Sequence, residues 1–322
     1  MLALLALLAW PALAQDYPNT QNFGGAPDRQ APWYQICMRV QHAAPKLPAA
    51  LESHCDADTL YYTKLDQAVT SAAEWAAVRR CASATGDTDV LSMLYANGLG
   101  VPRDLDVATH YACSAGGAPA EMEGRVLHLS TLAAGARYDQ CDDITSGMMG
   151  GVCSAIRAAR AGRVEAAYVA RLRASLPALQ GRALDRLVKA NAAFATAHGD
   201  RETPRGGTGY NGFVVDAQAR ETEWLREHLA AFEKGVFKVP PPAQYALDDA
   251  ELNRLYGERM QTLSSDAGTD AISATDIRTT QRAWLAYRDA WLAFAALRYP
   301  QLPADSLKAL LTQWRLRQLT SG

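Results

Sequence analysis

Several features that define catalytic or nucleic-acid-binding proteins are missing from this sequence. No HExxH or GxSxG motif occurs, and the six histidines stand in no recognised catalytic spacing. No CxxC pair is present, which argues against a thioredoxin-type redox site. The 32 Lys and Arg nearly balance the 34 Asp and Glu, leaving a net charge of −2, so a nucleic-acid or anionic-membrane binder is not expected. We therefore expect neither an enzyme nor a protein that needs a metal or cofactor.

Segments with the alternating pattern of β-strands are also scarce, as are runs of β-branched residues. Alanine-rich segments with helical spacing dominate instead. We predict an all-α protein, with an N-terminal helical segment that contains a hairpin, followed by two tandem small helical bundles.

The one strongly apolar run lies at the start of the chain. Residues 2–14 are apolar and end in Ala12-Leu13-Ala14, a small-x-small site that suits signal peptidase. The run is too short to span a bilayer as a helix, and no other segment approaches transmembrane length. We predict a signal peptide over residues 1–14, cleavage near Ala14, a periplasmic or secreted location, and a flexible leader over residues 15–35.

An even number of cysteines in an exported chain is typical of disulfides. Six cysteines allow fifteen pairings. We favour the sequential set, which is Cys37–Cys55, Cys81–Cys113 and Cys141–Cys153. A zinc site using His110 and Cys113 is the alternative, although this spacing matches no common zinc motif.

Residues 91–117 have the pattern of an antiparallel helical hairpin. One helix ends at Asn97-Gly98, where glycine takes the left-handed cap conformation, and Asp104 or Asp106 caps the next helix. The segment resembles the Sel-like repeat, a relative of the tetratricopeptide repeat, at Leu91, Tyr95, Gly98, Gly100, Val101, Asp104, Ala108 and Ala115. We place one such repeat at about 88–123, within a helical segment of residues 36–137. A single hairpin cannot form a solenoid, because stacked repeats share their core, so we expect it to pack on residues 60–84.

The C-terminal half contains an internal repeat. Phe194 corresponds to Trp284, and Trp224 to Trp314, at the same offset along the chain. Large residues from 277 to 294 fall on one face of a helix. Residues 240–242, all proline, separate the copies as a stiff linker would. We predict two domains, residues 138–239 and 240–322, each with an aromatic helix between two others.

This repeated unit resembles the lysozyme inhibitor LprI-like family. The second copy carries the resemblance at Leu252, Asn253, Tyr256, Gln281, Trp284, Tyr287, Arg288 and Phe294, and in a last helix at 314–319. The first copy carries it at Tyr138, Cys141, Cys153, Phe194, Arg205-Gly206-Gly207-Thr208, Arg220 and Leu225. The second copy departs from the family by having no cysteines, and the first has Ala197-His198 where the second has Tyr287-Arg288. The resemblance implies a secreted bacterial protein that binds a lysozyme.

Three groups of residues are candidates for the binding surface. The aromatic stripe is either the core of a bundle or an exposed surface that includes Tyr287 and Arg288. Residues 207–212 spell GxGxxG but lack the preceding strand and directly following helix of a dinucleotide site. As a surface loop, this segment would offer Arg205, Thr208 and Tyr210 as an inhibitory finger. The third group is acidic and suits a cationic partner such as a lysozyme: Asp139, Asp142 and Asp143.

We expect an exported bacterial envelope protein of the LprI type that blocks a muramidase sterically, without catalysis. The alternative is a periplasmic interaction scaffold that does not inhibit lysozyme. In either case the expected partner is a protein, a lysozyme or another envelope protein, and not a nucleic acid.

Overall fold

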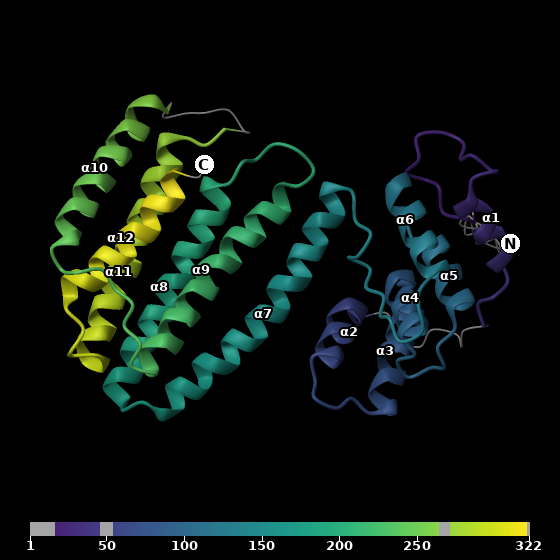
Figure 1. Ribbon diagram of the computed structural model, residues 1–322, viewed down its shortest axis with the longest axis horizontal. Coiled ribbons are helices and arrows are strands. Elements are labelled where there is room, and N and C mark those ends of the chain that lie inside the picture. Colours follow the sequence, from purple (N-terminus) through teal and green to yellow (C-terminus); the bar gives the residue numbers. More distant parts are fainter. Residues whose placement is uncertain (1–16, 46–53, 264–270, 321–322) are drawn as a thin grey trace, which may run out of the picture. The chain divides into compact units, whose positions relative to one another are not determined.

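The computed structural model describes residues 17–45, 54–263 and 271–320 (Figure 1). All regular structure in these ranges is helical, with twelve α-helices and no strand. The prediction of an all-α protein is therefore confirmed. The chain divides into two compact units, Met1–Thr145 and Ser146–Gly322, which we describe separately. The predicted signal peptide over residues 1–14 lies outside the described residues.

The first unit is built from six helices: α1 (Pro32–Val40), α2 (Ala57–Leu65), α3 (Ala72–Thr85), α4 (Thr88–Asn97), α5 (Leu105–Ser114) and α6 (Pro119–Ser130). The side chains of Asp56, Ser71, Asp87 and Asp104 cap four of them by accepting a backbone N–H of the first turn. The core surrounds α4, because every residue from 90 to 96 is buried, and α3 and α5 pack against it.

The α4–α5 hairpin forms as its sequence pattern predicts. Helix α4 ends at Asn97, and Gly98 takes the left-handed conformation with φ of 65°. Asp104 then caps α5, and the buried Ser92 hydroxyl donates to the Ala108 carbonyl at 3.0 Å. The hairpin also contacts α2 and α3, which cover most of the predicted packing region. Its assignment to the Sel-like family stays a prediction.

Residues 17–31, predicted as part of a flexible leader, are instead attached to the first unit. The Tyr17 hydroxyl donates to the Cys37 carbonyl at 3.1 Å, and the Asn19 N–H donates to the Cys113 carbonyl at 2.9 Å. Helix α1 then takes up residues 32–40. The leader prediction is wrong here because a Pro- and Gly-rich composition does not exclude an irregular segment held by side-chain and backbone hydrogen bonds.

Two of the predicted disulfides are wrong. Cys37 bonds to Cys113, with Cα atoms 5.8 Å apart, because α1 packs against α5 and α6. Cys55 bonds to Cys81 because α2 and α3 lie against each other. The pairing of Cys113 also removes the zinc alternative. Cys141 and Cys153 are disulfide-bonded as well, in keeping with the third predicted pair.

The second unit contains six longer helices: α7 (Gly147–Ser175), α8 (Ala178–Glu202), α9 (Tyr210–Glu233), α10 (Gln244–Thr262), α11 (Ala274–Arg298) and α12 (Ala304–Thr320). Helix α9 packs on α7 and α8, α10 packs on α12, and α8 packs along α11, as Figure 1 shows. The two predicted bundles therefore share one core instead of forming separate ones. Within it Phe194 stacks on Tyr287 with ring centroids 5.6 Å apart, and Trp224 stacks on Trp314 at the same separation.

Glycines bring α7 and α9 close together. A Cβ atom at Gly147 would lie 2.5 Å from Thr208 Oγ1, and one at Gly212 would lie 3.3 Å from the Cα of Gly151. The predicted loop is also shorter than expected, because α9 already begins at Tyr210. The glycines of the GxGxxG sequence thus permit helix packing, which explains their spacing without a dinucleotide.

Replacing Gly100 with Ala is expected to destabilise the first unit severely. Gly100 has φ of +68°, and a Cβ there would lie 2.3 Å from the Cβ of Trp75. The left-handed backbone costs about 1–2 kcal/mol for a residue with a side chain, and overpacking adds about 1–3 kcal/mol. Gly86→Ala is the matched control, because Gly86 has φ of +71° but open space around it. Urea unfolding should show a clearly larger loss for Gly100→Ala; equal losses would contradict the close approach to Trp75.

Candidate functional site

The structure separates the two residues predicted from the aromatic stripe. Tyr287 is 1% exposed and its hydroxyl accepts a hydrogen bond from Trp291 Nε1 at 2.9 Å, so it belongs to the core and cannot form a binding surface. Arg288 reaches the surface, with its guanidinium 5.3 Å from the centre of the Trp284 ring and 3.2 Å from the exposed Asp289 carboxylate.

The residues of the predicted inhibitory finger have mainly local contacts. Arg205 lies 3.2 Å from the carboxylate of Asp276 at the start of α11, which anchors the loop. Thr208 is exposed, but its hydroxyl lies against Gly147, and Tyr210 is half-buried at the start of α9. This segment therefore connects helices that are fixed at both ends.

The predicted acidic surface is largely occupied by contacts within the first unit. Asp139 accepts a hydrogen bond from the Tyr62 hydroxyl at 3.0 Å, and Asp142 accepts one from the backbone N–H of Asp139 at 2.9 Å. Asp143 lies 2.8 Å from Nδ1 of His128. These carboxylates shape the turn before α7 and are poorly available to a cationic partner.

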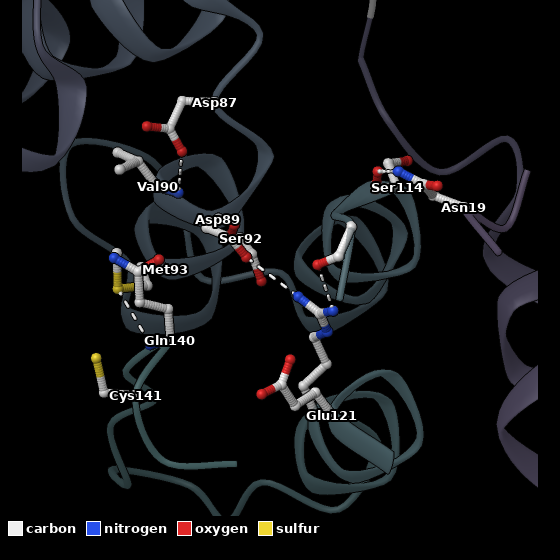
Figure 2. A network of polar contacts seen from close by, with 12 residues as sticks. Asn19, Asp87, Asp89, Val90, Ser92, Met93, Ser114, Glu121, Gln140 and Cys141 are labelled. Carbon is white, nitrogen blue, oxygen red and sulfur yellow. Dashed lines mark hydrogen bonds and ion pairs between the residues drawn. The ribbon is translucent and has the colours of Figure 1, made fainter. Parts of the chain in front are cut away.

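Further acidic groups of the first unit are half-buried, and Figure 2 shows Asp87 and Asp89 among them. Asp89 is 3.3 Å from the Arg125 guanidinium, yet burial raises the pKa of the Asp89 carboxyl to about 6. Asp58 accepts a hydrogen bond from Gln140 Nε2 at 2.7 Å; burial, followed by the charge of Asp87, raises its pKa to about 6. Asp58 holds the segment around Gln140 against α2, and Asp89 links α4 to Arg125 of α6. Sequence spacing gives no sign of either contact.

The second unit contains a buried polar network that no sequence pattern indicates. Glu202 and Arg315, 113 residues apart, form a two-pronged ion pair with both N–O distances at 2.7 Å and side chains 5% and 0% exposed. Glu221 accepts hydrogen bonds from Trp314 Nε1 at 2.8 Å and Gln318 Nε2 at 2.6 Å. His198 Nδ1 lies 3.0 Å from Glu221, but the angle is unsuitable for a hydrogen bond.

A pocket of about 510 Å³ opens onto this network between the ends of α8, α9 and α12. The carboxylates of Glu202 and Glu221 face it but are already paired. The pocket therefore offers few free polar groups from the network, whose main effect is to fix α12 to α8 and α9.

A second hollow, of about 320 Å³, runs between α10 and α11, and we call it the arginine groove. From α10 it is lined by Asp249, Leu252, Asn253 and Tyr256. From α11 it is lined by Arg278, Gln281, Arg282, Trp284, Leu285 and Arg288. Six of these ten residues carry the family resemblance of the second copy: Leu252, Asn253, Tyr256, Gln281, Trp284 and Arg288. The groove is thus the surface on which the family pattern is concentrated.

Hydrogen-bond donors dominate the arginine groove. Trp284 is 1% exposed, and its indole N–H has no partner among the described residues. Leaving a buried donor unpaired costs about 1–3 kcal/mol, so this position calls for an explanation. Arg278 and Arg282 also make no ion pair or hydrogen bond with a described residue. The single acidic lining residue, Asp249, accepts hydrogen bonds from Tyr245 and Asn253, both at 3.2 Å.

Comparison with known proteins identifies one family in this region. Residues 242–320 match the model of a family described as lysozyme inhibitor LprI. The matched segment comprises α10 to α12 and contains the whole arginine groove. No curated protein and no solved structure matches the chain. The first predicted copy has no such match, so the duplication stays a prediction.

The described part of the chain contains neither a candidate membrane-spanning helix nor a candidate metal site. None of its helices combines the length and apolar character needed to cross a membrane. Over the same residues, no group of three or more His, Cys, Asp or Glu side chains is arranged to hold a metal ion.

The first unit should become more stable as the pH falls from about 6 to about 4. Asp58 has a raised pKa of about 6 in the folded protein, against 3.8 for the unfolded reference, so protonation favours the folded state over this interval. Asp58→Asn should reduce the dependence of the unfolding free energy on pH. Glu123→Gln, which neutralises an exposed carboxylate of α6, is the control. Urea unfolding across this pH range measures the effect, and an unchanged slope for Asp58→Asn would refute it.

Breaking the Glu202–Arg315 pair is expected to destabilise the second unit by about 3–5 kcal/mol, because an unpaired charge would remain buried. Arg315→Met tests this by chemical denaturation. Combining it with Glu202→Met removes both charges and should recover part of the loss. A double variant that is less stable than the single variant would argue against a coupled pair.

Proposed function

We propose that this protein is an exported bacterial envelope protein of the lysozyme-inhibitor type, which acts by binding a muramidase and not by catalysis. The observation that carries this proposal is the coincidence of the family match over residues 242–320 with a formed groove lined by the family's pattern residues. Export is supported by the disulfide-bonded cysteines, since such bonds persist in oxidising compartments.

The arginine groove is suited to a steric mode of inhibition. Its walls are two helices of 19 and 25 residues, and α11 is fixed by its packing on α8. A firm surface loses little conformational entropy on binding, which favours affinity. Occupation of the muramidase cleft by this face would exclude the glycan substrate without any chemical step.

This mode replaces the two surfaces that the sequence first suggested. The acidic residues Asp139, Asp142 and Asp143 lie outside the matched segment and already have hydrogen-bond or ion-pair partners. The segment from Arg205 to Tyr210 also precedes the match. We therefore place the inhibitory surface on α10 and α11.

Purified protein is expected to slow the lysis of bacterial cell walls by lysozyme at micromolar concentration. Leu285→Trp should weaken this inhibition at least tenfold, because Leu285 lines the groove and a larger side chain would fill it. Leu247→Trp is the control: Leu247 is an exposed leucine of α10, at 66%, that does not line the groove. Turbidity assays of cell-wall lysis measure both variants.

The interaction-scaffold alternative predicts a different outcome. A scaffold would bind another envelope protein and leave lysis unchanged. No slowing of lysis together with no measurable binding to any lysozyme would therefore refute the proposal. Inhibition that is equally weakened by Leu285→Trp and Leu247→Trp would refute the placement of the surface in the groove.

A further inference from the structure

We infer that the arginine groove is a carboxylate-binding site, and that its occupant in the proposed function is an acidic patch of the partner protein. This inference rests on the proposed function, because the catalytic cleft of a glycoside hydrolase is lined by carboxyl groups. The groove combines a net positive charge, one unpaired buried donor and few free acceptors.

The cationic groups follow one side of α11. Arg278 and Arg282 are four residues apart and Arg288 follows six residues later, so the three span about 15 Å along the helix. With Asp249 as the one acidic lining residue, the groove carries three positive charges and one negative, a net of +2. Guanidinium groups pair with carboxylates through two parallel hydrogen bonds, which gives geometric preference as well as attraction.

The indole N–H of Trp284 is a second and independent indication of a ligand. The two other tryptophans of the matched segment have partners, since Trp291 donates to Tyr287 and Trp314 donates to Glu221. Trp284 is as buried as Trp291, lines the groove and has no acceptor among the described residues. An oxygen atom of a bound carboxylate would supply the acceptor that this donor lacks.

The remaining groove residues leave the arginines available. Both carboxylate oxygens of Asp249 accept a hydrogen bond, one from Tyr245 and the other from Asn253. Arg288 pairs with Asp289, whose side chain is 66% exposed, and exposed ion pairs of this kind are weak. A carboxylate entering the groove can therefore replace solvent at Arg278 and Arg282 and compete for Arg288.

Titration of the full-length ¹⁵N-labelled protein with hexaglutamate peptide tests the inference. The Trp284 indole N–H resonance should shift on addition of hexaglutamate and stay in place on addition of hexaglutamine. Arg282→Gln should weaken binding at least tenfold. Arg254→Gln, which removes the same charge from a paired arginine outside the groove, should change affinity less than twofold. Trp284→Phe identifies the resonance.

The inference is overturned if hexaglutamate leaves the Trp284 resonance in place, or if Arg282→Gln and Arg254→Gln bind it alike. It is also overturned if tripolyphosphate binds as tightly as hexaglutamate, because the groove would then be a general anion site. A lysis assay separates this inference from the proposed function. Hexaglutamate binding without lysozyme inhibition would remove the proposed function alone. If Arg282→Gln inhibits lysozyme as strongly as the wild type does, the carboxylate-site inference is refuted and the proposed function is not.

Discussion

The packing of α8 along α11 is the contact on which the second unit depends. Phe194 stacks on Tyr287, and the buried Thr280 hydroxyl donates to the Ala197 carbonyl at 3.1 Å. This contact joins the two sets of three helices into a single core and commits one face of α11 to the interior. The opposite face of α11 is then left to Arg278 and Arg282, and Trp284 belongs to the buried face but also lines the groove. The position of the groove therefore follows from the core packing, because burying one face of α11 turns its other face toward the groove.

A second constraint fixes the remaining helix of the matched segment. Arg315 of α12 is fully buried and is paired with Glu202 of α8, while Glu221 of α9 receives Trp314 and Gln318. Buried charges need partners of fixed geometry, so these contacts allow one position of α12 and not several. Since α12 packs on α10, the network also sets where the α10 wall of the groove stands.

Sequence patterns predicted the faces of helices better than the partners of those faces. The spacing of Trp284, Trp291 and Phe294 indicated a buried stripe, and all three are core residues. Tyr287 lies on the same stripe, and the alternative prediction that it is a surface residue is wrong. Periodicity indicates that a helix face is buried but not which helix covers it. For this reason the sequence predicted two separate bundles, whereas the structure has a single core. The hairpin was predictable because Gly98 and Asp104 act on their own neighbours.

Contacts between residues that are far apart in the chain could not be predicted from the sequence patterns. Cys37 pairs with Cys113 and not with Cys55, since the choice depends on how α1 packs. The Glu202–Arg315 pair joins residues of different helices, and the missing partner of the Trp284 indole is visible from the structure alone. The family resemblance nevertheless includes six of the groove residues, although nothing in their spacing indicates that they surround one hollow.

Mapping a lysozyme on the full-length protein by NMR tests the central claim most directly. The account predicts that unlabelled lysozyme perturbs backbone amides of α10 and α11 along the arginine groove, and leaves those of α1 to α6 unchanged. Perturbations confined to residues 139–143 or 205–210, or no perturbation at saturating lysozyme, would contradict it.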